Sequence, residues 1–403
     1  MIQKPRGTRD FIADSALLRE QITSAFILFA QNMGYKPCQP PTFEGVGLFK
    51  RAVGESSDIV QKELFYLKGD EEKYALRPEL TAGVVRALVE KGIKSMPKPV
   101  NTYTLGNVYR YEKPQKGRYR EFTQFDLNSF GEQNAFSDAY LIANIYNLLK
   151  KIIGSDVKIF LNTLGSPKTK QKFANELTDA IGKNTDKLCP DCKLRVASNP
   201  LRVLDCKLGC KDEIGDIPQI SDYLSDDEKK YLDTVVAFLK DNGVNFEVDD
   251  TLMRGLDYYT SLVFEITMPD DSSRSAVLAG GGRFDGLVAQ LDGPDVGAIG
   301  VGLGLDRIVE NIKRREVKQK CEYIICPVSE EYSKSAYKIA LQLNQKSKSA
   351  RVSTAYNLKT SLSDAVKGDC QYVVIAGEET KNNEVIIRDL KKNSQEEVSI
   401  DEL

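Results

Sequence analysis

The stretch Arg110-Tyr-Glu-Lys-Pro-Gln-Lys-Gly-Arg-Tyr-Arg-Glu-Phe-Thr-Gln-Phe-Asp126 is the most informative in the chain. Residues 103–111 and 120–130 predict two strands joined by its Pro-Gln-Lys-Gly turn, which makes a hairpin. Cations crowd the turn: Arg110, Lys113, Lys116, Arg118 and Arg120. Because guanidinium groups pair bidentately with phosphate oxygens, the hairpin favours a polyphosphate site. A solvated basic hairpin is the alternative, and it is the commoner case for an isolated charge run.

The composition sets wider bounds. A chain of 403 residues is long enough for two or three domains. No apolar run approaches the ~18 residues that a membrane span needs. The N-terminal segment has no signal-peptide core, so we expect a cytoplasmic protein with no membrane partner. Since the net charge is only −2, any binding of nucleic acid must come from local patches.

The chain contains no histidine. This absence excludes Ser-His-Asp and Cys-His catalysis, histidine metal ligation and a histidine general base. Proton transfer must therefore fall to carboxylates, to Lys or Tyr, or to the substrate itself.

Four of the eight cysteines follow the pattern C-x2-C-x13-C-x3-C: Cys189, Cys192, Cys206 and Cys210. This spacing is close to that of a four-thiolate zinc site. The second pair is loosely spaced, however, and the usual glycine or aromatic knuckle residues are missing. Ordinary reduced thiols are therefore favoured over zinc, and no metal ligand is assigned.

Changes in composition predict the domain organisation. Residues 1–315 form a first domain, in which residues about 166–230 predict an inserted helical subdomain rich in Lys and Asp. Residues 316–320 belong to a charged linker. In residues 321–403 the order strand-helix-strand-helix-strand predicts a small α/β domain with a mostly parallel sheet.

Local signals predict several element ends. Asp14 and Ser15 are cap candidates for a helix that Gly34 can close, and Ser137 is the predicted cap of a helix through about Lys151. Gly300, Gly302 and Gly304 alternate, so they lie on one face of a predicted strand. That face either receives a flat ring, with Arg307 beside it, or allows close packing of strand on helix. The next helix is predicted from Ile308.

Three segments in this order resemble the signatures of class II aminoacyl-tRNA synthetases: the Pro40-Pro41 segment, Arg110 to Gln124, and Gly302 to Arg307. Arg254-Gly-Leu-Asp-Tyr-Tyr-Thr-Ser-Leu-Val-Phe-Glu265 narrows the resemblance to histidyl-tRNA synthetases. Shorter motifs at 5–10, 77–82, 199–205 and 279–285 agree with it. The resemblance covers residues 5 to about 390.

The resemblance implies an α+β fold: a class II synthetase antiparallel sheet flanked by helices, an inserted helical subdomain and a C-terminal α/β anticodon-binding domain. It implies a histidine–tRNA ligase that uses ATP, with Mg²⁺, to turn L-histidine into histidyl-adenylate and then esterifies the 3′ end of histidine tRNA. The first motif implies a homodimer. The alternative is the non-catalytic regulatory subunit of ATP phosphoribosyltransferase, which the retained arginines and the last domain oppose.

The site residues follow from motif position. Arg110 and Arg254 are the implied catalytic cations on the α-phosphate, and ATP also meets Glu112, Arg118 and Arg307. The implied histidine-binding residues are Glu79, Leu80, Thr81, Gln124, Asn128, Arg254, Tyr258 and Tyr259. Lys113, Gln115 and Lys116 are the implied contacts to the tRNA acceptor end. Asn128 departs from the family, which has a carboxylate there, so it brings no charge to the imidazole.

Overall fold

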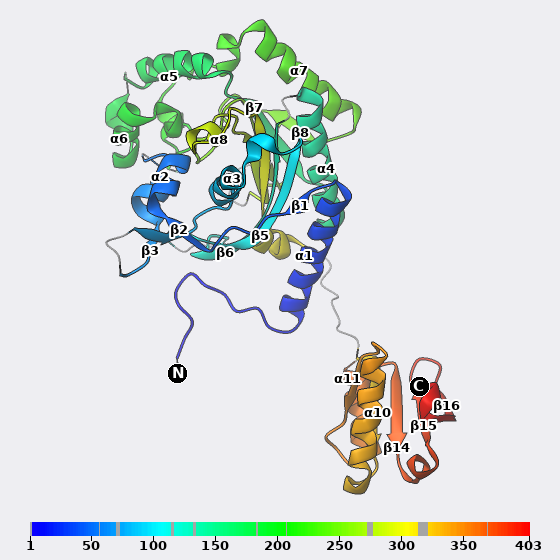
Figure 1. Ribbon diagram of the computed structural model, residues 1–403. Coiled ribbons are helices and arrows are strands. Elements are labelled where there is room, and N and C mark those ends of the chain that lie inside the picture. Colours follow the sequence, from blue (N-terminus) through cyan, green and yellow to red (C-terminus); the bar gives the residue numbers. More distant parts are fainter. Residues whose placement is uncertain are drawn as a thin grey trace. The chain divides into compact units, whose positions relative to one another are not determined.

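The structure is a computed structural model that describes residues 2–55, 57–69, 73–113, 117–131, 134–182, 184–206, 208–271, 277–312, 321–368 and 370–403. The chain divides into two compact units (Figure 1). Unit 1 contains Met1–Phe11 and Leu18–Arg315, and unit 2 contains Ile12–Leu17 and Glu316–Leu403. The expected linker at 316–320 lies outside the described residues.

An eight-stranded sheet forms the centre of unit 1. Its strands, in spatial order, are β1 (Lys36–Pro37), β5 (Val100–Tyr109), β6 (Glu121–Phe130), β11 (Ala298–Gly304), β10 (Ala279–Arg283), β9 (Leu262–Thr267), β7 (Lys158–Thr163) and β8 (Phe246–Val248). The inner pairs are antiparallel, and only the edge pairs β1–β5 and β7–β8 are parallel. The antiparallel pair β5–β6 confirms the expected hairpin.

Helices cover this sheet and connect its strands (Figure 1). They are α1 (Asp14–Asn32), α2 (Val46–Val53), α3 (Thr81–Glu90), α4 (Ala135–Ile153), α8 (Leu287–Gln290) and α9 (Leu305–Asn311), with the short turns η1 (Ile59–Glu63) and η2 (Ile93–Ser95). A separate small sheet consists of three strands, in the spatial order β2 (Phe43–Gly45), β4 (Tyr74–Leu76) and β3 (Phe65–Tyr66).

Strand β6 separates the apolar core from the site. Phe125 and Leu127 are fully buried, and the Phe125 ring lies 5.3 Å from that of Phe26 on α1. Because successive side chains of a strand point to opposite faces, Gln124 and Asn128 lie on the other face. The alternation of β6 therefore directs Gln124 and Asn128 away from α1.

Two predicted helix starts are wrong. The cap of α4 is Asn134, whose side chain accepts from the Phe136 N–H at 2.9 Å, and Ser137 lies inside the first turn. Both residue types are good caps, and the sequence alone ranked the wrong one. Helix α9 begins at Leu305 and not at Ile308, so Arg307 lies in its first turn.

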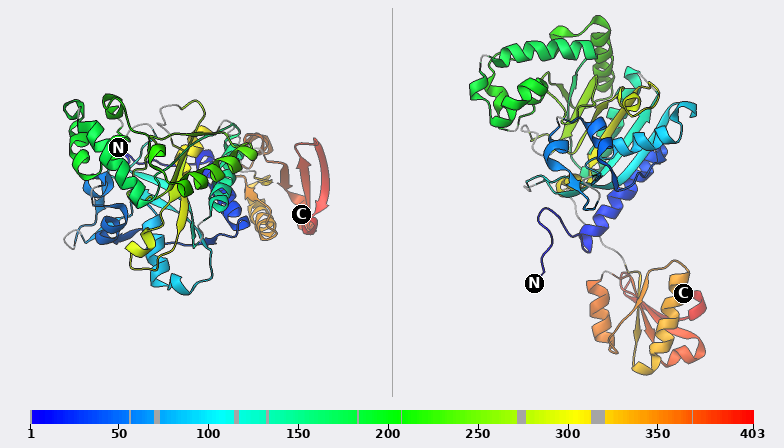
Figure 2. Two further views of the ribbon diagram at one scale, coloured as in Figure 1. Left: turned by 90° about the horizontal axis from the view of Figure 1, so that it is seen from above. Right: turned by 60° about the vertical axis from the view of Figure 1, so that its left-hand side comes forward.

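The inserted segment between β7 and β8 contains α5 (Pro167–Gly182), α6 (Pro190–Ser198) and α7 (Asp226–Asp241). Four short 3-10 turns join the helices: η3 (Thr185–Lys187), η4 (Pro200–Val203), η5 (Cys210–Glu213) and η6 (Ile220–Tyr223). Figure 2 shows these helices gathered at one end of the unit 1 sheet. A capping box between Ser225 and Glu228 begins α7.

Unit 2 has a five-stranded sheet in the order β13 (Ala350–Val352), β12 (Tyr323–Pro327), β14 (Tyr372–Ala376), β15 (Glu384–Asp389) and β16 (Ser394–Ser399). Its helices are α10 (Ser333–Gln345) and α11 (Leu358–Lys367), with η7 (Glu330–Tyr332), η8 (Glu378–Asn382) and η9 (Ile400–Glu402). The three predicted strands pair in parallel, as expected, since β12 is parallel to both β13 and β14. Strands β15 and β16, which were not predicted, add two antiparallel pairs at one edge. Strand β16 is largely exposed and polar, so its sequence carries little strand signal.

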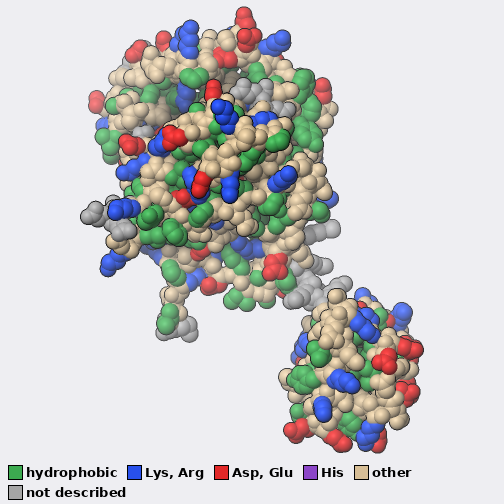
Figure 3. Space-filling view, viewed as in Figure 1, with side chains coloured by type: hydrophobic (Ala, Val, Ile, Leu, Met, Phe, Trp, Pro, Cys, Tyr) green, Lys and Arg blue, Asp and Glu red, His purple; other side chains and the backbone are tan. Residues whose placement is uncertain are grey.

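Charged side chains of both signs are interspersed over the visible face of each unit (Figure 3). Among the described residues, no helix combines the length and the apolar character needed to cross a bilayer.

Candidate active site

Glycines of β10 and β11 leave part of one face of the unit 1 sheet without side chains, and we call this surface the glycine floor. Gly302 pairs with Asp126 of β6, Gly300 pairs with Asn128, and Gly280 pairs with Glu265 of β9. A Cβ atom on Gly300 would lie 2.5 Å from the Asn128 Oδ1, and one on Gly302 would lie 2.7 Å from the Gln124 Nε2. The glycines therefore give room for polar side chains to lie against the sheet.

Two carboxylates and two tyrosines meet over this floor. Glu79 accepts from the Thr81 N–H at 2.8 Å and the Ala82 N–H at 2.7 Å, which anchors it at the start of α3. The Tyr258 hydroxyl lies 3.5 Å from the Glu79 Oε2. The rings of Tyr258 and Tyr259 are 4.8 Å apart, and both are buried. We call Glu79, Asp126, Tyr258 and Tyr259 the acidic pocket.

The acidic pocket concentrates negative charge away from water. Burial raises the pKa of Asp126 well above its usual value, and the neighbouring Glu79 raises it further, against the effect of Arg110 and Arg77. Burial also raises the pKa of Glu79. Two buried carboxyl groups in one site favour the binding of a cation. The free energy of ionising either group away from water is unfavourable unless a positive charge lies beside it.

Two amide side chains on the same sheet face each have a buried polar atom without a hydrogen-bond partner among the described residues. The Gln124 Nε2 donates to the Asp126 Oδ1 at 3.3 Å. Its Oε1 atom and the Asn128 Nδ2 are buried and have no hydrogen-bond partner among the described residues. Because an unsatisfied buried polar atom costs about 1–3 kcal/mol, such atoms in a native fold point to a ligand that satisfies them.

Three arginines gather where the β5–β6 hairpin meets α9. The Arg110 Nε donates to the Pro78 carbonyl at 2.9 Å, and the Arg118 Nη1 lies 3.5 Å from the Glu112 carboxylate. Arg307 donates from Nε to the Gly117 carbonyl and from Nη1 to the Val277 carbonyl, each at 2.9 Å. Backbone carbonyls thus hold two of the three guanidinium groups without neutralising them.

We call Arg110, Arg118 and Arg307 the arginine cluster. Their positive charges repel one another. Burial lowers the pKa of Arg307, and the charges of Arg118 and Arg110 lower it further, against the effect of Glu112 and Glu265. A cation whose pKa falls beside other cations is in a site that an anion would stabilise.

Arg254 lies over Gly280 on the same sheet face. It forms an ion pair with Glu265, and its guanidinium occupies the place that a Gly280 side chain would fill. Burial opposes its charge, but Glu265 and Tyr259 outweigh burial and raise the pKa of Arg254. Its buried Nε has no partner among the described residues. Arg254 therefore keeps one donor for a further acceptor.

The site residues that the sequence predicts fall into three groups according to where they lie. Most of the nucleotide and histidine sets lie on this one sheet face or at its rim, with Leu80 fully buried at the N-cap of α3. Lys113 is exposed on the hairpin. Gln115 and Lys116 lie outside the described residues.

Sequence reasoning missed two acidic residues of the site. Asp126 lies between Gln124 and Asn128, and strand alternation from Gln124 was sufficient to place it on their face. Glu265 closes a motif that was recognised, but only the pairing of β9 with β10 brings it to Arg254.

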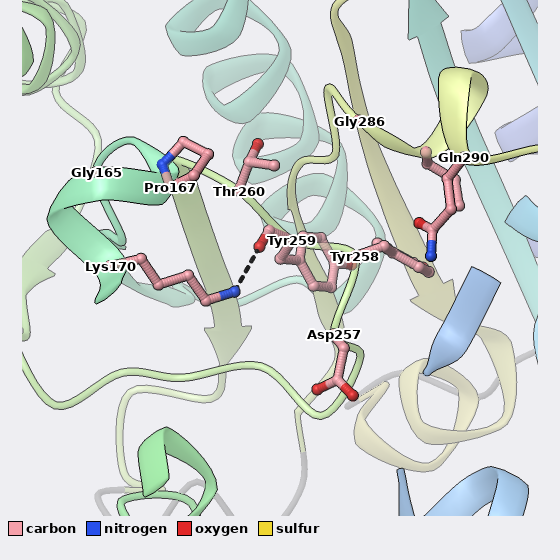
Figure 4. A pocket seen from close by; sticks show the side chains of 10 residues that line it. Gly165, Pro167, Lys170, Asp257, Tyr258, Tyr259, Thr260, Gly286 and Gln290 are labelled. Atoms are coloured by element: carbon pink, nitrogen blue, oxygen red, sulfur yellow. Dashed lines mark hydrogen bonds between the residues drawn. The ribbon is translucent and has the colours of Figure 1, made fainter. Parts of the chain in front are cut away.

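A cavity of about 240 Å³ borders the tyrosine segment (Figure 4). Figure 4 shows Lys170 reaching from α5 to the Tyr259 carbonyl, to which its Nζ donates at 3.2 Å. Burial lowers the pKa of Lys170, although Asp257 acts against this shift. The inserted segment thus contacts the backbone that positions the acidic pocket.

The antiparallel sheet with its arginine-bearing hairpin and the following α9 defines a class II aminoacyl-tRNA synthetase. The family model of the tRNA synthetase class II core domain (G, H, P, S and T) matches residues 65–389. A histidine–tRNA ligase of Campylobacter hominis is 38% identical over 408 residues, covering 100% of this chain and 99% of that protein. A histidine–tRNA ligase of Staphylococcus haemolyticus is 33% identical over 414 residues, covering 100% of this chain and 98% of that protein.

A solved structure agrees with these sequences. Apo histidyl-tRNA synthetase of S. aureus superimposes with a TM-score of 0.81 at 26% identity, covering 100% of this chain and 98% of that chain. The chain belongs to the histidine–tRNA ligase family.

Proposed function

We propose that the chain activates L-histidine with ATP, giving histidyl-adenylate and pyrophosphate, and then transfers the histidyl group to the 3′ end of histidine tRNA. One observation carries this proposal most: an acidic pocket under aromatic rings adjoins a cluster of arginines on a single sheet face. The pocket suits the ammonium of an amino acid, and the arginines suit the phosphates of a nucleotide.

In this proposal the acidic pocket binds histidine. Glu79, Thr81 and Gln124 hold the α-ammonium, and Asp126 adds a second negative charge. Tyr258 and Tyr259 line the imidazole site with Asn128. A neutral imidazole offers one donor and one acceptor, so a site that pairs both rejects apolar side chains, which would leave buried polar atoms unpaired.

Arg110 and Arg254 are proposed to act on the α-phosphate. The histidine carboxylate attacks the α-phosphorus while pyrophosphate leaves, and negative charge grows on the phosphoryl oxygens. Such a reaction needs positioning and charge neutralisation, and a carboxylate nucleophile needs no general base. A chain without histidine can therefore carry it out. Glu112, Arg118 and Arg307 bind the remaining parts of ATP.

Mg²⁺ is proposed to accompany ATP. This ion usually binds one or two protein carboxylates together with phosphate oxygens. Glu112 and Glu265 fit that role, because Glu112 lies 3.5 Å from the Arg118 guanidinium and Glu265 pairs with Arg254. When bound, the ion would neutralise phosphate charge.

The remaining assignments complete the proposal. Lys113, Gln115 and Lys116 contact the tRNA acceptor end, and unit 2 binds the anticodon loop. Residues 1–315, with the insertion, form the catalytic domain, 316–320 the linker and 321–403 the anticodon-binding domain. The protein works in the cytoplasm as a homodimer through the Pro40-Pro41 segment.

ATP–pyrophosphate exchange tests the proposed activity. The purified full-length chain should exchange label between pyrophosphate and ATP when L-histidine is present, and none of the other amino acids should replace it. A folded protein that binds histidine and shows no exchange would instead favour the regulatory subunit of ATP phosphoribosyltransferase. Retention of Arg110, Arg254 and Arg307 is the reason to expect exchange.

A further inference from the structure

Four cysteine sulfurs meet inside the inserted segment. The Sγ atoms of the cysteine cluster, Cys189, Cys192, Cys206 and Cys210, all lie within 4.8 Å of one another. Cys189 is the N-cap residue of α6, Cys192 lies in its first turn, and Cys210 begins η5. All four are free thiols. Residues separated by up to 21 positions are therefore folded so that their sulfurs share one small space.

The geometry matches tetrahedral metal ligation. A zinc–sulfur bond is about 2.3 Å, so two ligands at a tetrahedral angle are separated by about 3.8 Å. The Cys189 and Cys206 sulfurs are 3.9 Å apart. A disulfide would need about 2.05 Å between them, and it would join only two of the four. We propose that the cysteine cluster binds one structural Zn²⁺ ion.

The surroundings suit four thiolates around a dication, a centre with a net charge of −2. The Cys189 N–H donates to the Cys210 Sγ at 3.3 Å, and the Arg195 Nη1 lies 3.8 Å from the Cys192 Sγ. The N-terminal end of α6 adds further positive potential. Donors of this kind orient metal-binding thiolates and stabilise their charge.

The site is closed, as in structural zinc centres. Cys192 is fully buried and Cys210 is 4% exposed, whereas Cys189 and Cys206 are half-buried. All four positions of a tetrahedral ion would be filled by sulfur, which leaves no position for water or substrate. The chain around the cysteines consists of a short helix and 3-10 turns, and such segments gain stability from a metal because binding energy becomes folding energy.

The cysteine cluster also flanks the segment that supports the tyrosines. Arg202, which lies between Cys192 and Cys206 in the chain, donates to the Asp257 Oδ1 from Nη2 at 2.9 Å and from Nε at 3.1 Å. Its Nη2 also donates to the Gly255 carbonyl at 2.9 Å, and the Asn199 Nδ2 donates to Asp257 at 3.0 Å. A fixed cysteine cluster would therefore hold residues 254–259 in place.

Elemental analysis of the intact chain tests the metal site. The protein is expressed without a polyhistidine tag, because the chain has no histidine of its own and a tag would bind zinc. After purification in metal-free buffer, about one zinc per chain is expected. Cobalt exchanged into the protein should show thiolate-to-cobalt charge transfer and the absorption of tetrahedral Co²⁺. Less than about 0.1 zinc per folded chain after reconstitution, or iron in its place, would overturn the proposal.

A matched pair of variants locates the ion. Cys206→Ser should lose the zinc and unfold at a lower temperature, whereas Cys38→Ser, a half-buried cysteine outside the cluster, should keep one zinc per chain. Zinc at full stoichiometry in soluble Cys206→Ser would contradict the assignment. If this variant fails to fold, the zinc and cobalt measurements on the unchanged chain still decide.

An effect on histidine binding is a further consequence, and it rests on the proposed function. Removal of zinc by a chelator should raise the KM for histidine in pyrophosphate exchange more than the KM for ATP, since the tyrosine segment is what loosens. Equal changes in both constants would contradict this link. Metal content does not depend on any activity, so failure of the proposed function and failure of the zinc site are distinguishable.

Discussion

Strands β6 in unit 1 and β12 in unit 2 each lie between two neighbours and are largely buried, yet they use their faces differently. In β12, Tyr323 and Ile325 pack into one apolar cluster and Ile324 and Cys326 into another. In β6 one face carries Phe125 and Leu127, both fully buried. The other face presents Gln124, Asp126 and Asn128 to the glycines of β11.

This difference shows what each sheet is built for. Apolar side chains on both faces of β12 contribute stability through burial. The second face of β6 instead buries one carboxyl and two amide side chains whose charges and hydrogen bonds the protein leaves partly unmatched, which opposes folding. A fold retains such groups where a ligand completes them. The comparison predicts that substitutions on the two sheets will affect different measurements.

The largest effect is expected for Arg254→Ala, because this cation is proposed to stabilise charge that appears only in the transition state. The rate of ATP–pyrophosphate exchange should fall at least ~100-fold, or about 3 kcal/mol, by analogy with loss of one oxyanion donor. Arg51→Ala is the matched control, since Arg51 forms an exposed ion pair with Asp292 at 2.8 Å, of a kind worth less than ~1 kcal/mol. A wild-type rate in folded Arg254→Ala would remove the role assigned to it.

A smaller effect is expected for Asp126→Asn, which removes one charge from the acidic pocket. The KM for histidine should rise about tenfold or more, in line with loss of a charge-assisted hydrogen bond, with a lesser change in the KM for ATP.

The pH dependence of this variant sharpens the test. Because the pKa of Asp126 is raised, the free pocket takes up a proton as the pH falls through that value, and the proton competes with the histidine ammonium. The KM for histidine should therefore rise toward acid pH more steeply in the unchanged protein than in Asp126→Asn. Protonation of the substrate imidazole affects both proteins, so it serves as an internal control. Parallel profiles would show that Asp126 stays outside the binding step.

The smallest effect is expected in unit 2. Ile325→Val removes one buried methylene and should lower the free energy of unfolding of that unit by about 0.5–1.5 kcal/mol. Denaturant unfolding measures this loss. Pyrophosphate exchange, which needs only the unit 1 site, should be unchanged. A fall in the exchange rate without unfolding would mean that the two sheets are functionally coupled.

Much of the local structure was predictable from the sequence. The pairing of β5 with β6 and the alternation of β6 depend on signals within a few residues, such as turn chemistry and hydrophobic period. The motifs also identified most of the residues that surround the site. The predictions failed where two local signals competed, as for Asn134 and Ser137, or where a strand was short of apolar residues, as for β16.

Only the tertiary structure decided which distant groups share a space. Glu79 precedes α3, Asp126 lies on β6, and Tyr258 follows the inserted segment; strand register and helix packing bring them together. The pairing of Gly302 with Asp126 and the meeting of the four cysteine sulfurs have the same origin. The sequence by itself determined the chemistry available, because side chains and local periods are written in it. Position was left to long-range packing: a one-residue shift in register would turn strand residues such as Asp126 to the opposite face.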